Sequence, residues 1–291
     1  MNMNAIQIKN VTKRYHDVTA LDHVSFSFAF GKIYGFLGRN GAGKSTLINI
    51  IANRIFADEG EVLVDGIPAR ENMLVHEKIF CMSEADLYEK NLKVKDHFKW
   101  MQRFYDCFDL DKAFQTAEKF ELDVNQKFKA LSKGYQSIFK LIAALSLNVR
   151  YVIFDEPVLG LDANHRELFY DLLLRDFETR EQTIIIATHL IEEVANIIEE
   201  VVLIDKGKVL LQESTDTLLE TGYCISGLAQ DVDDYCRGKN VIGYDELGSL
   251  KLAYLLGEKA QLPQGSHLQI SPMNLQKLFV KMTEKGGGEN E

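Results

Sequence analysis

The N-terminal part of the chain shows the two-residue alternation of hydrophobic side chains that is typical of half-buried β-strands. Residues 5–11 and 24–30 follow this alternation, and phenylalanine recurs at every second position late in the latter range. Residues 61–64 form a further apolar run, which ends at the turn dipeptide Asp65-Gly66. We therefore expect an antiparallel β piece at the front of the fold.

Farther along the chain, short apolar runs alternate with longer segments whose apolar residues recur at helical spacing. The expected strands are residues 32–37, 151–154, 183–187 and 201–204. The expected helices are residues 44–53, 163–175 and 190–198, with residues 94–147 largely helical. Strands separated by helices imply crossover connections and a largely parallel sheet. The pattern predicts an α/β core with a helical insertion in its middle.

The character of the sequence changes after about residue 219, where short apolar stretches alternate with turn residues and a final helix follows. These features indicate a small, separate α/β unit. We expect a core domain over residues 1–220 with a helical subdomain at about 85–148, an accessory α/β region over 221–285, and a disordered tail over 286–291.

Composition excludes some classes of protein. The chain has 291 residues, 46% hydrophobic and 26% charged, so it can bury a sizeable core. Its formal net charge of −10 argues against a broad basic face, and we expect no nucleic-acid partner. The four cysteines lack metal-ligand spacing, which predicts reduced thiols. No apolar run reaches the roughly 20 residues of a membrane span, and the polar residues 1–10 predict no signal peptide.

Residues 38–46 match the phosphate-binding pattern G-x-x-x-x-G-K-[ST], between an expected strand and an expected helix. Glycines let backbone N–H groups surround bound phosphates, and the helix N-terminus adds a partial positive charge. We expect Lys44 to reach the β- and γ-phosphates and the Ser45 hydroxyl to ligate Mg²⁺. The residues expected around the nucleotide are Gly38, Asn40, Gly41, Gly43, Lys44, Ser45 and Thr46.

Two carboxylates follow the apolar run 151–154, at the strand end where open α/β sheets bind their ligands. We expect Asp155 to hold Mg²⁺ through water and Glu156 to activate the attacking water as general base. Either carboxylate alone could instead cap the following helix. A phosphate loop alone is compatible with kinases, GTPases and many ATPases. The adjacent pair of carboxylates reduces this set of candidate functions.

With these and further motifs in the expected order, the chain resembles the nucleotide-binding subunit of an ABC transporter over roughly residues 5–220. Residues 131–136, Leu-Ser-Lys-Gly-Tyr-Gln, stand where the family has its LSGGQ signature. His189 matches the switch histidine that hydrogen-bonds the γ-phosphate. The resemblance implies ATP as the nucleotide, catalytic roles for Lys44 and Glu156 together with His189, and the α/β P-loop fold of an ABC cassette.

The resemblance also implies a dimer of ATPase subunits, identical or different. In the family, the signature contacts the γ-phosphate held by the opposite subunit, here through Ser132 and Gly134 before a helix expected to begin near Ser137. Asp162 matches the D-loop, which contacts the active site of the partner subunit. Tyr15 stands where the family stacks an aromatic ring on adenine.

The chain departs from the family pattern at three positions. Lys133 replaces the first signature glycine, and Tyr135 replaces the glutamine. Glu84 stands where many relatives have a glutamine that contacts Mg²⁺, a task that a carboxylate can also perform. These features resemble the bacterial subfamily serving two-subunit exporters with a separate permease, including ATPases of acetoin-utilisation or cell-envelope-stress operons.

Aromatic residues are concentrated in residues 86–108 of the expected helical subdomain. In the family this region receives a short helix of the permease. Aromatics at helical spacing also form cores, so we expect only Tyr88, Trp100 and Tyr105 to face outward.

Together these features predict an ATPase subunit that couples Mg-ATP binding and hydrolysis to a separate transmembrane permease, which we expect to be an exporter. We expect a cytoplasmic location at the inner face of the cell membrane. One alternative is a non-transport ABC ATPase acting on ribosomes or DNA, although such proteins usually carry two cassettes or long coiled-coil insertions. A small-molecule P-loop kinase would leave Ser132, Gly134, Asp162 and His189 unexplained.

Overall fold

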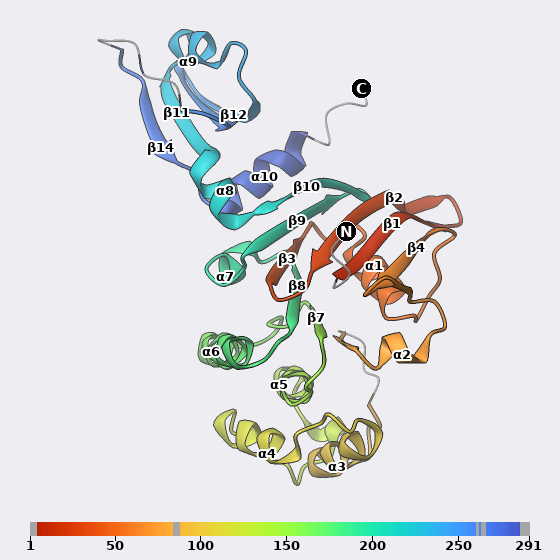
Figure 1. Cartoon of the computed structure of the whole chain (residues 1–291). Coiled ribbons are helices and arrows are strands. Elements are labelled where there is room, and N and C mark those ends of the chain that lie inside the picture. The colour runs from red at the N-terminus through yellow and green to blue at the C-terminus, as the bar shows by residue number, and fades with distance from the viewer. Residues whose placement is uncertain (1–4, 84–87, 260–261, 263–265, 286–291) are drawn as a thin grey trace.

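The computed structural model describes residues 5–83, 88–259, 262 and 266–285 (Figure 1). Its first sheet is antiparallel and has the strand order β2-β1-β4-β5. The strands are β1 (Ala5–Tyr15), β2 (Val18–Ala29), β4 (Glu59–Val64) and β5 (Ile67–Pro68). Alternate side chains such as Phe26 and Phe28 point into the core beneath this sheet, as the alternation predicted.

The second sheet has six strands in the order β10-β9-β3-β8-β7-β6 and lies at the centre of the molecule. The strands are β3 (Ile33–Leu37), β6 (Ile79–Met82), β7 (Tyr151–Asp155), β8 (Thr183–Thr188), β9 (Glu200–Asp205) and β10 (Lys208–Ser214). All neighbours pair in parallel except β10, which pairs antiparallel with β9. The sheet is therefore largely parallel, as predicted.

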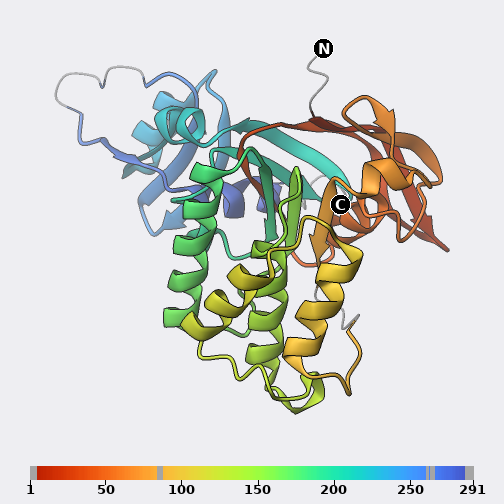
Figure 2. The same ribbon diagram turned by 60° about the horizontal axis from the view of Figure 1, so that its bottom comes forward.

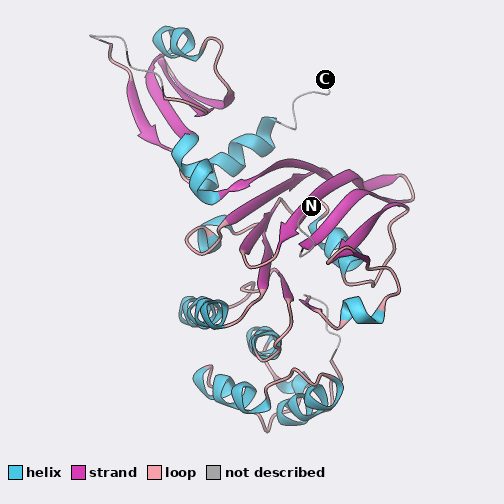
Figure 3. Cartoon of the chain, in the orientation of Figure 1, coloured by secondary structure: helices cyan, strands magenta, loops and turns pink. Residues whose placement is uncertain are grey.

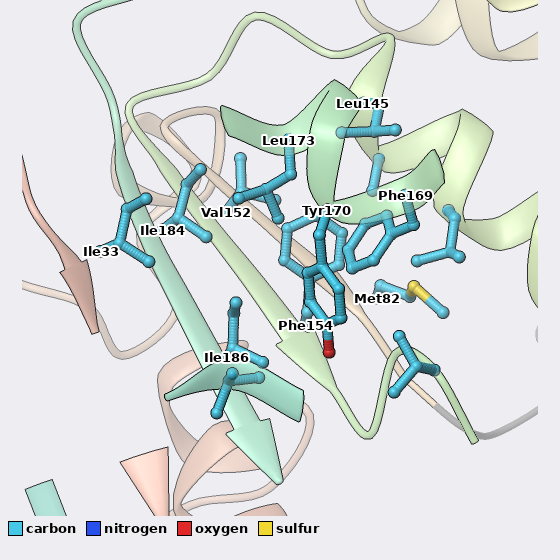
Figure 4. Packing of buried hydrophobic residues seen from close by; sticks show 14 of the residues in the cluster. Ile33, Met82, Leu145, Val152, Phe154, Phe169, Tyr170, Leu173, Ile184 and Ile186 are labelled. Carbon is cyan, nitrogen blue, oxygen red and sulfur yellow. The ribbon is translucent and has the colours of Figure 1, made fainter. Parts of the chain in front are cut away.

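Both faces of the central sheet are covered, which explains why its strands are continuous apolar runs. On one face, helix α1 (Lys44–Ile51) packs with the first sheet. On the other face, helix α6 (Ala163–Thr179) places Phe169, Tyr170 and Leu173 against Phe154 and Ile186 of the sheet (Figure 4). The loops that follow β3, β7 and β8 are therefore anchored on rigid, buried strands.

Between β6 and β7 the chain forms a separate layer of helices, which Figures 2 and 3 show beside the sheets. They are α3 (Val94–Phe104), α4 (Leu110–Lys119), a 3₁₀ turn (Phe128–Ala130) and α5 (Lys133–Leu145). The short helix α2 (Met73–His76) precedes this layer in the chain, between β5 and β6. The expectation that the last helix begins near Ser137 is wrong. Helix α5 begins at Lys133, because the Ser132 Oγ accepts a hydrogen bond from the Tyr135 N–H and caps the helix.

The C-terminal part forms a third sheet in the order β12-β13-β11-β14. Its elements, with the two helices that precede it, are α7 (Ile191–Val194), α8 (Thr215–Thr221), β11 (Gly222–Leu228), α9 (Ala229–Cys236), β12 (Val241–Leu247), β13 (Leu250–Leu256), β14 (Gln269–Pro272) and α10 (Leu275–Lys285). Helix α9 covers one face of the sheet, and α10 packs between β12 and helices α7 and α8. We call residues 222–285 the C-terminal unit and residues 5–221 the cassette, and we propose this division as the domain boundary.

Candidate active site

The loop between β3 and α1 approaches neighbouring backbone so closely that two of its positions have no room for a side chain. A Cβ on Gly38 would lie 2.6 Å from the Ile204 carbonyl oxygen. A Cβ on Gly43 would lie 2.6 Å from the Ala20 carbonyl oxygen, and the Gly43 φ of 111° is left-handed. Glycine is required at both positions to form this backbone cradle, which ends at the N-terminus of α1.

Lys44, the first residue of α1, holds a buried cation inside this cradle. Its side chain is 5% exposed, and its Nζ donates to the carbonyl oxygens of Gly38 at 2.6 Å and Arg39 at 3.3 Å. Burial lowers the pKa of the Lys44 ammonium, while the carboxylates of Glu156 and Asp155 act in the opposite direction. Such an ammonium is suited to bind phosphate oxygens, which would replace the two carbonyl contacts.

Ser45 and Asp155 lie together beside the cradle, although they are far apart in the sequence. The Ser45 Oγ lies 3.3 Å from Asp155 Oδ1, and Asp155 is buried at the carboxyl end of β7. A hydroxyl and a carboxylate are hard oxygen donors of the kind that Mg²⁺ prefers. The pair therefore fits a magnesium ion. Glu84, the third expected metal ligand, lies outside the described residues.

Glu156 adopts a left-handed backbone conformation, with φ of 49°, directly after β7. Such a conformation costs a non-glycine residue on the order of 1–3 kcal/mol. It is supported by a hydrogen bond from the Glu156 N–H to the Ala187 carbonyl oxygen of β8 at 2.9 Å. This backbone conformation turns the Glu156 side chain toward Thr188 and His189 at the end of β8.

Three side chains surround the Glu156 carboxylate. His189 Nδ1 lies 2.9 Å from Oε1, the Thr188 hydroxyl donates to Oε2 at 2.9 Å, and Lys44 Nζ lies 3.6 Å from Oε1. The sequence predicted Lys44 and His189 at this site but missed Thr188. A polar residue at the end of a buried strand, next to His189, was the available signal. Thr188 also accepts a hydrogen bond from the Leu190 N–H, which fixes its hydroxyl.

A cavity of about 290 Å³ separates the carboxylate pair from the start of α5. Asp155 and Glu156 line one side, and Lys133, Gln136 and the buried Lys140 line the other. No sequence pattern singled out Lys140, because a lysine on a helix is normally solvated.

The structure places the other expected nucleotide contacts away from this centre. Tyr15 is exposed at the end of β1, and Lys13 Nζ lies 5.5 Å from the centre of its ring. Ser132 and Asp162 are exposed and cap helices α5 and α6, and Gly134 follows Ser132 in the first turn of α5. Their positions on the surface are compatible with contacts to a second subunit rather than with contacts to this chain's own cradle.

Comparisons with known proteins agree with this geometry. The family model described as ABC transporter matches residues 21–159. An uncharacterized ABC transporter ATP-binding protein of Methanocaldococcus jannaschii is 32% identical over 216 residues, which cover 70% of this chain and 76% of that protein. The chain belongs to the ABC transporter ATP-binding proteins. The predicted family is confirmed, and as its member the chain is an ATPase that binds ATP.

Two further relatives of this ABC ATPase cover similar lengths. The ABC transporter ATP-binding protein YtrB of Bacillus subtilis is 26% identical over 244 residues, 84% of each chain. Nod factor export ATP-binding protein I of Rhizobium etli is 28% identical over 226 residues, 76% of this chain and 71% of that protein.

A solved dimeric structure of a bacterial ABC transporter cassette shares 26% identity with this ABC ATPase at a TM-score of 0.65, covering 72% of this chain and 98% of that one. The predicted fold class is therefore confirmed. Among the described residues of the ABC ATPase, no helix combines the length and the apolar character that crossing a membrane requires.

Proposed function

We propose that this ABC ATPase hydrolyses Mg-ATP in a dimer and drives a separate membrane permease, in the direction of export. The observation that carries the proposal is the convergence of Lys44, Thr188 and His189 on the Glu156 carboxylate, beside the Ser45–Asp155 pair. These groups come from the carboxyl ends of two adjacent strands, β7 and β8, and from the N-terminus of α1. They supply a phosphate-binding cation, oxygen ligands for a metal and a general base in one place.

Each residue of the chain has a distinct task in this proposal. Lys44 binds the β- and γ-phosphates. Their negative charge favours the protonated form of Lys44, which burial disfavours. Mg²⁺, held by Ser45 and Asp155, supplies neutralisation of charge on the transferred phosphoryl group. Glu156 accepts the proton of the attacking water, with its carboxylate oriented by Thr188. His189 moves from Glu156 to the γ-phosphate when the nucleotide binds.

The dimer is supported by what lies on the surface. Ser132 and Gly134 lie at the N-terminus of α5, and Asp162 lies at the N-terminus of α6. None of these three residues lines the cavity next to Glu156. We propose that these residues complete the ATP site of a second subunit, identical or different. The solved relative that is a dimeric cassette supports this arrangement. Tyr15 is proposed to stack on adenine from the same subunit as Lys44.

The permease is supported by an exposed aromatic groove of about 830 Å³ on the helical layer. Phe104 is 71% exposed, Trp100 49% and Tyr105 40%, and all three line this groove. Tyr88 lines it but packs inward, with its ring centre 4.8 Å from that of Phe139, so the expectation that Tyr88 faces outward is wrong. The groove fits a short apolar helix of a membrane protein. We place the ATPase at the inner face of the cell membrane on this basis, and the Nod factor export relative supports the direction.

The first test is the substitution Glu156→Gln, which removes the base but keeps the size of the side chain. We expect ATP turnover to fall by a factor of about 100 or more and ATP to trap a dimer, seen by light scattering after gel filtration. Glu167→Gln, an exposed position on α6, is the matched control and should turn over normally. Full turnover in Glu156→Gln would contradict the assignment of the base.

The second test addresses the permease. We expect Phe104→Ser to reduce binding of the ATPase to membranes isolated from the cells that produce it, by a factor of about ten, while ATP binding is unchanged. Leu74→Ser, equally exposed on α2 but outside the groove, is the control. Association with ribosomes instead of membranes, insensitive to Phe104→Ser, would favour the non-transport alternative.

A further inference from the structure

Helices α5 and α6 begin in the same way and next to each other. Ser132 caps α5 by accepting a hydrogen bond from the Tyr135 N–H at 3.2 Å. Asp162 caps α6 by accepting one from the His165 N–H at 2.9 Å. In both helices the residue three positions after the cap carries an aromatic ring. These rings, of Tyr135 and His165, have centres 6.1 Å apart at an angle of 64°.

The His165 ring connects several parts of this surface. Its Nδ1 lies 2.8 Å from Asp162 Oδ2, so the ring and the N–H of His165 together bind both oxygens of the cap. On its other side the ring stacks on the fully buried Phe120, with centres 5.8 Å apart and planes at 28°. The ring is thus held between Phe120 and Tyr135 while it holds the Asp162 carboxylate, which is otherwise exposed.

The two turns also meet through their backbones. A Cβ on Gly134 would lie 3.2 Å from the Gly160 carbonyl oxygen, closer than ordinary van der Waals contact. Gly160 has a left-handed φ of 81° two residues before Asp162. The turn at 132–135 and the loop at 160–162 therefore form one surface, with backbone contact at one point and the Tyr135–His165 ring contact at another.

We propose that His165 is a positioning residue that fastens the signature turn to the D-loop, so that both meet the second subunit's ATP as one rigid surface. The inference rests on the proposed function, in which Ser132, Gly134 and Asp162 complete that second site. His165 itself touches neither the nucleotide nor the partner's reacting atoms. It acts by fixing the Asp162 carboxylate and the Tyr135 turn relative to each other before the dimer closes, which lowers the entropy lost on closure.

This role differs from simple packing in what it affects. The ATP cradle of each subunit lies on β3 and α1, so losing His165 should leave ATP binding to the separate subunit unchanged. It should impair only the step in which two subunits close on ATP. Tyr135, which stands in place of the signature glutamine, provides the partner ring for His165.

The experiment measures dimer formation in the Glu156→Gln background as ATP is titrated. We expect His165→Ala to raise the ATP concentration at half-dimerisation about tenfold and to lower the kcat of the otherwise unchanged chain by a similar factor. Affinity of the separate subunit for a fluorescent ATP analogue should stay within twofold. Glu167→Ala, exposed on the same helix, is the matched control and should behave as its parent.

Further variants separate the contacts that His165 makes. His165→Phe keeps the ring but loses the bond to Asp162, and His165→Asn keeps a donor but loses the ring, so each should be intermediate. Tyr135→Ala should resemble His165→Ala, and the double variant should be no worse than either, because both remove the same contact. If His165→Ala is poorly folded, His165→Phe and Tyr135→Ala still test the proposal.

Three outcomes would overturn the inference. In the first, His165→Ala reaches half-dimerisation at the same ATP concentration as its parent. In the second, the separate His165→Ala subunit loses as much affinity for ATP as the dimerisation assay shows. In the third, the effects of His165→Ala and Tyr135→Ala multiply in the double variant. Failure of the proposed function looks different. In that case the Glu156→Gln parent does not dimerise with ATP at all, and the positioning role falls with it.

Discussion

The cassette and the C-terminal unit are both built from sheets covered by helices, but they treat polar groups in opposite ways. The cassette buries the Lys44 ammonium and the Asp155 carboxylate and keeps Glu156 in a left-handed conformation. In the C-terminal unit lysines pair with half-exposed carboxylates, as in the ion pairs of Lys281 with Asp245 and of Lys251 with Asp233. Buried charge and backbone strain are costly, and proteins retain them where they serve function.

The cysteines of the C-terminal unit extend this contrast. Burial raises the pKa of both the Cys224 and the Cys236 thiols, so neither is an activated thiolate. The buried face of the unit is continuous with the core of the cassette, since Leu275 and Leu278 of α10 belong to the same cluster as Ile191 and Val194 of α7.

This continuity gives the unit a mechanical connection to the active site. Helix α7 begins two residues after His189, and α10 packs directly on α7. The side chain of Glu193 on α7 also forms an ion pair with Arg166 on α6, the helix that starts at the D-loop. Packed elements thus link α10 to the segment after His189 and to α6, and we expect a change in the position of α10 to affect both.

The largest expected effect comes from weakening this connection. Leu278→Ala leaves a cavity in the face of α10 that meets the cassette, and should reduce the free energy of unfolding by about 2–5 kcal/mol. We also expect its kcat to fall several-fold, because α7 and His189 lose support. Thermal unfolding and steady-state ATPase kinetics, measured at a temperature where the variant is folded, check both expectations.

Val232→Ala is the matched comparison within the C-terminal unit. Val232 is fully buried on α9, in a cluster on the opposite face of the third sheet, away from α7. Its substitution removes two buried carbon atoms and should reduce the free energy of unfolding by roughly 1.5–3 kcal/mol, with kcat unchanged. An equal loss of kcat in both variants at matched stability would show that the unit acts as a whole rather than through α10.

The sequence predicted the cassette in much more detail than the C-terminal unit, and the reason is physical. Strands β3, β7 and β8 are apolar runs buried on both faces, and the motifs at their ends are contiguous in sequence. The final helix of the C-terminal unit was expected, but β11 and α9 were missed. Their apolar residues are divided between a sheet face, a helix and the cassette, so no single periodicity stands out.

A similar distinction applies within the site. Lys44, Asp155, Glu156 and His189 could be located because each lies in a local pattern of known chemistry. The contact between Tyr135 and His165 could not, because it depends on how closely α5 and α6 begin side by side. The left-handed conformation of Glu156 was equally unpredictable, since it is imposed by the hydrogen bond to Ala187 across the sheet.

The smallest expected effect sharpens the comparison by testing the surface charges of the C-terminal unit. Asp245 on β12 accepts hydrogen bonds from Lys281 Nζ and from the Tyr254 hydroxyl, each at 2.6 Å. The bond from Lys281, followed by that from Tyr254, lowers the pKa of the Asp245 carboxyl. A carboxyl whose pKa is lowered on folding stabilises the protein above its unfolded pKa of about 3.9, and this stabilisation is lost as pH falls through the folded value.

Asp245→Asn should therefore be less stable than the parent at pH 7, and the difference should shrink as the pH falls below about 4, so that it is smaller at pH 3 than at pH 7. Because the Asp245 side chain is half exposed, we expect the difference to be below about 1 kcal/mol. Urea unfolding of both proteins at the two pH values measures it, with the exposed Glu220→Gln as control. A difference of several kcal/mol, or one unchanged at pH 3, would mean that Asp245 behaves like the buried charges of the cassette, and the contrast between the two regions would not hold at β12.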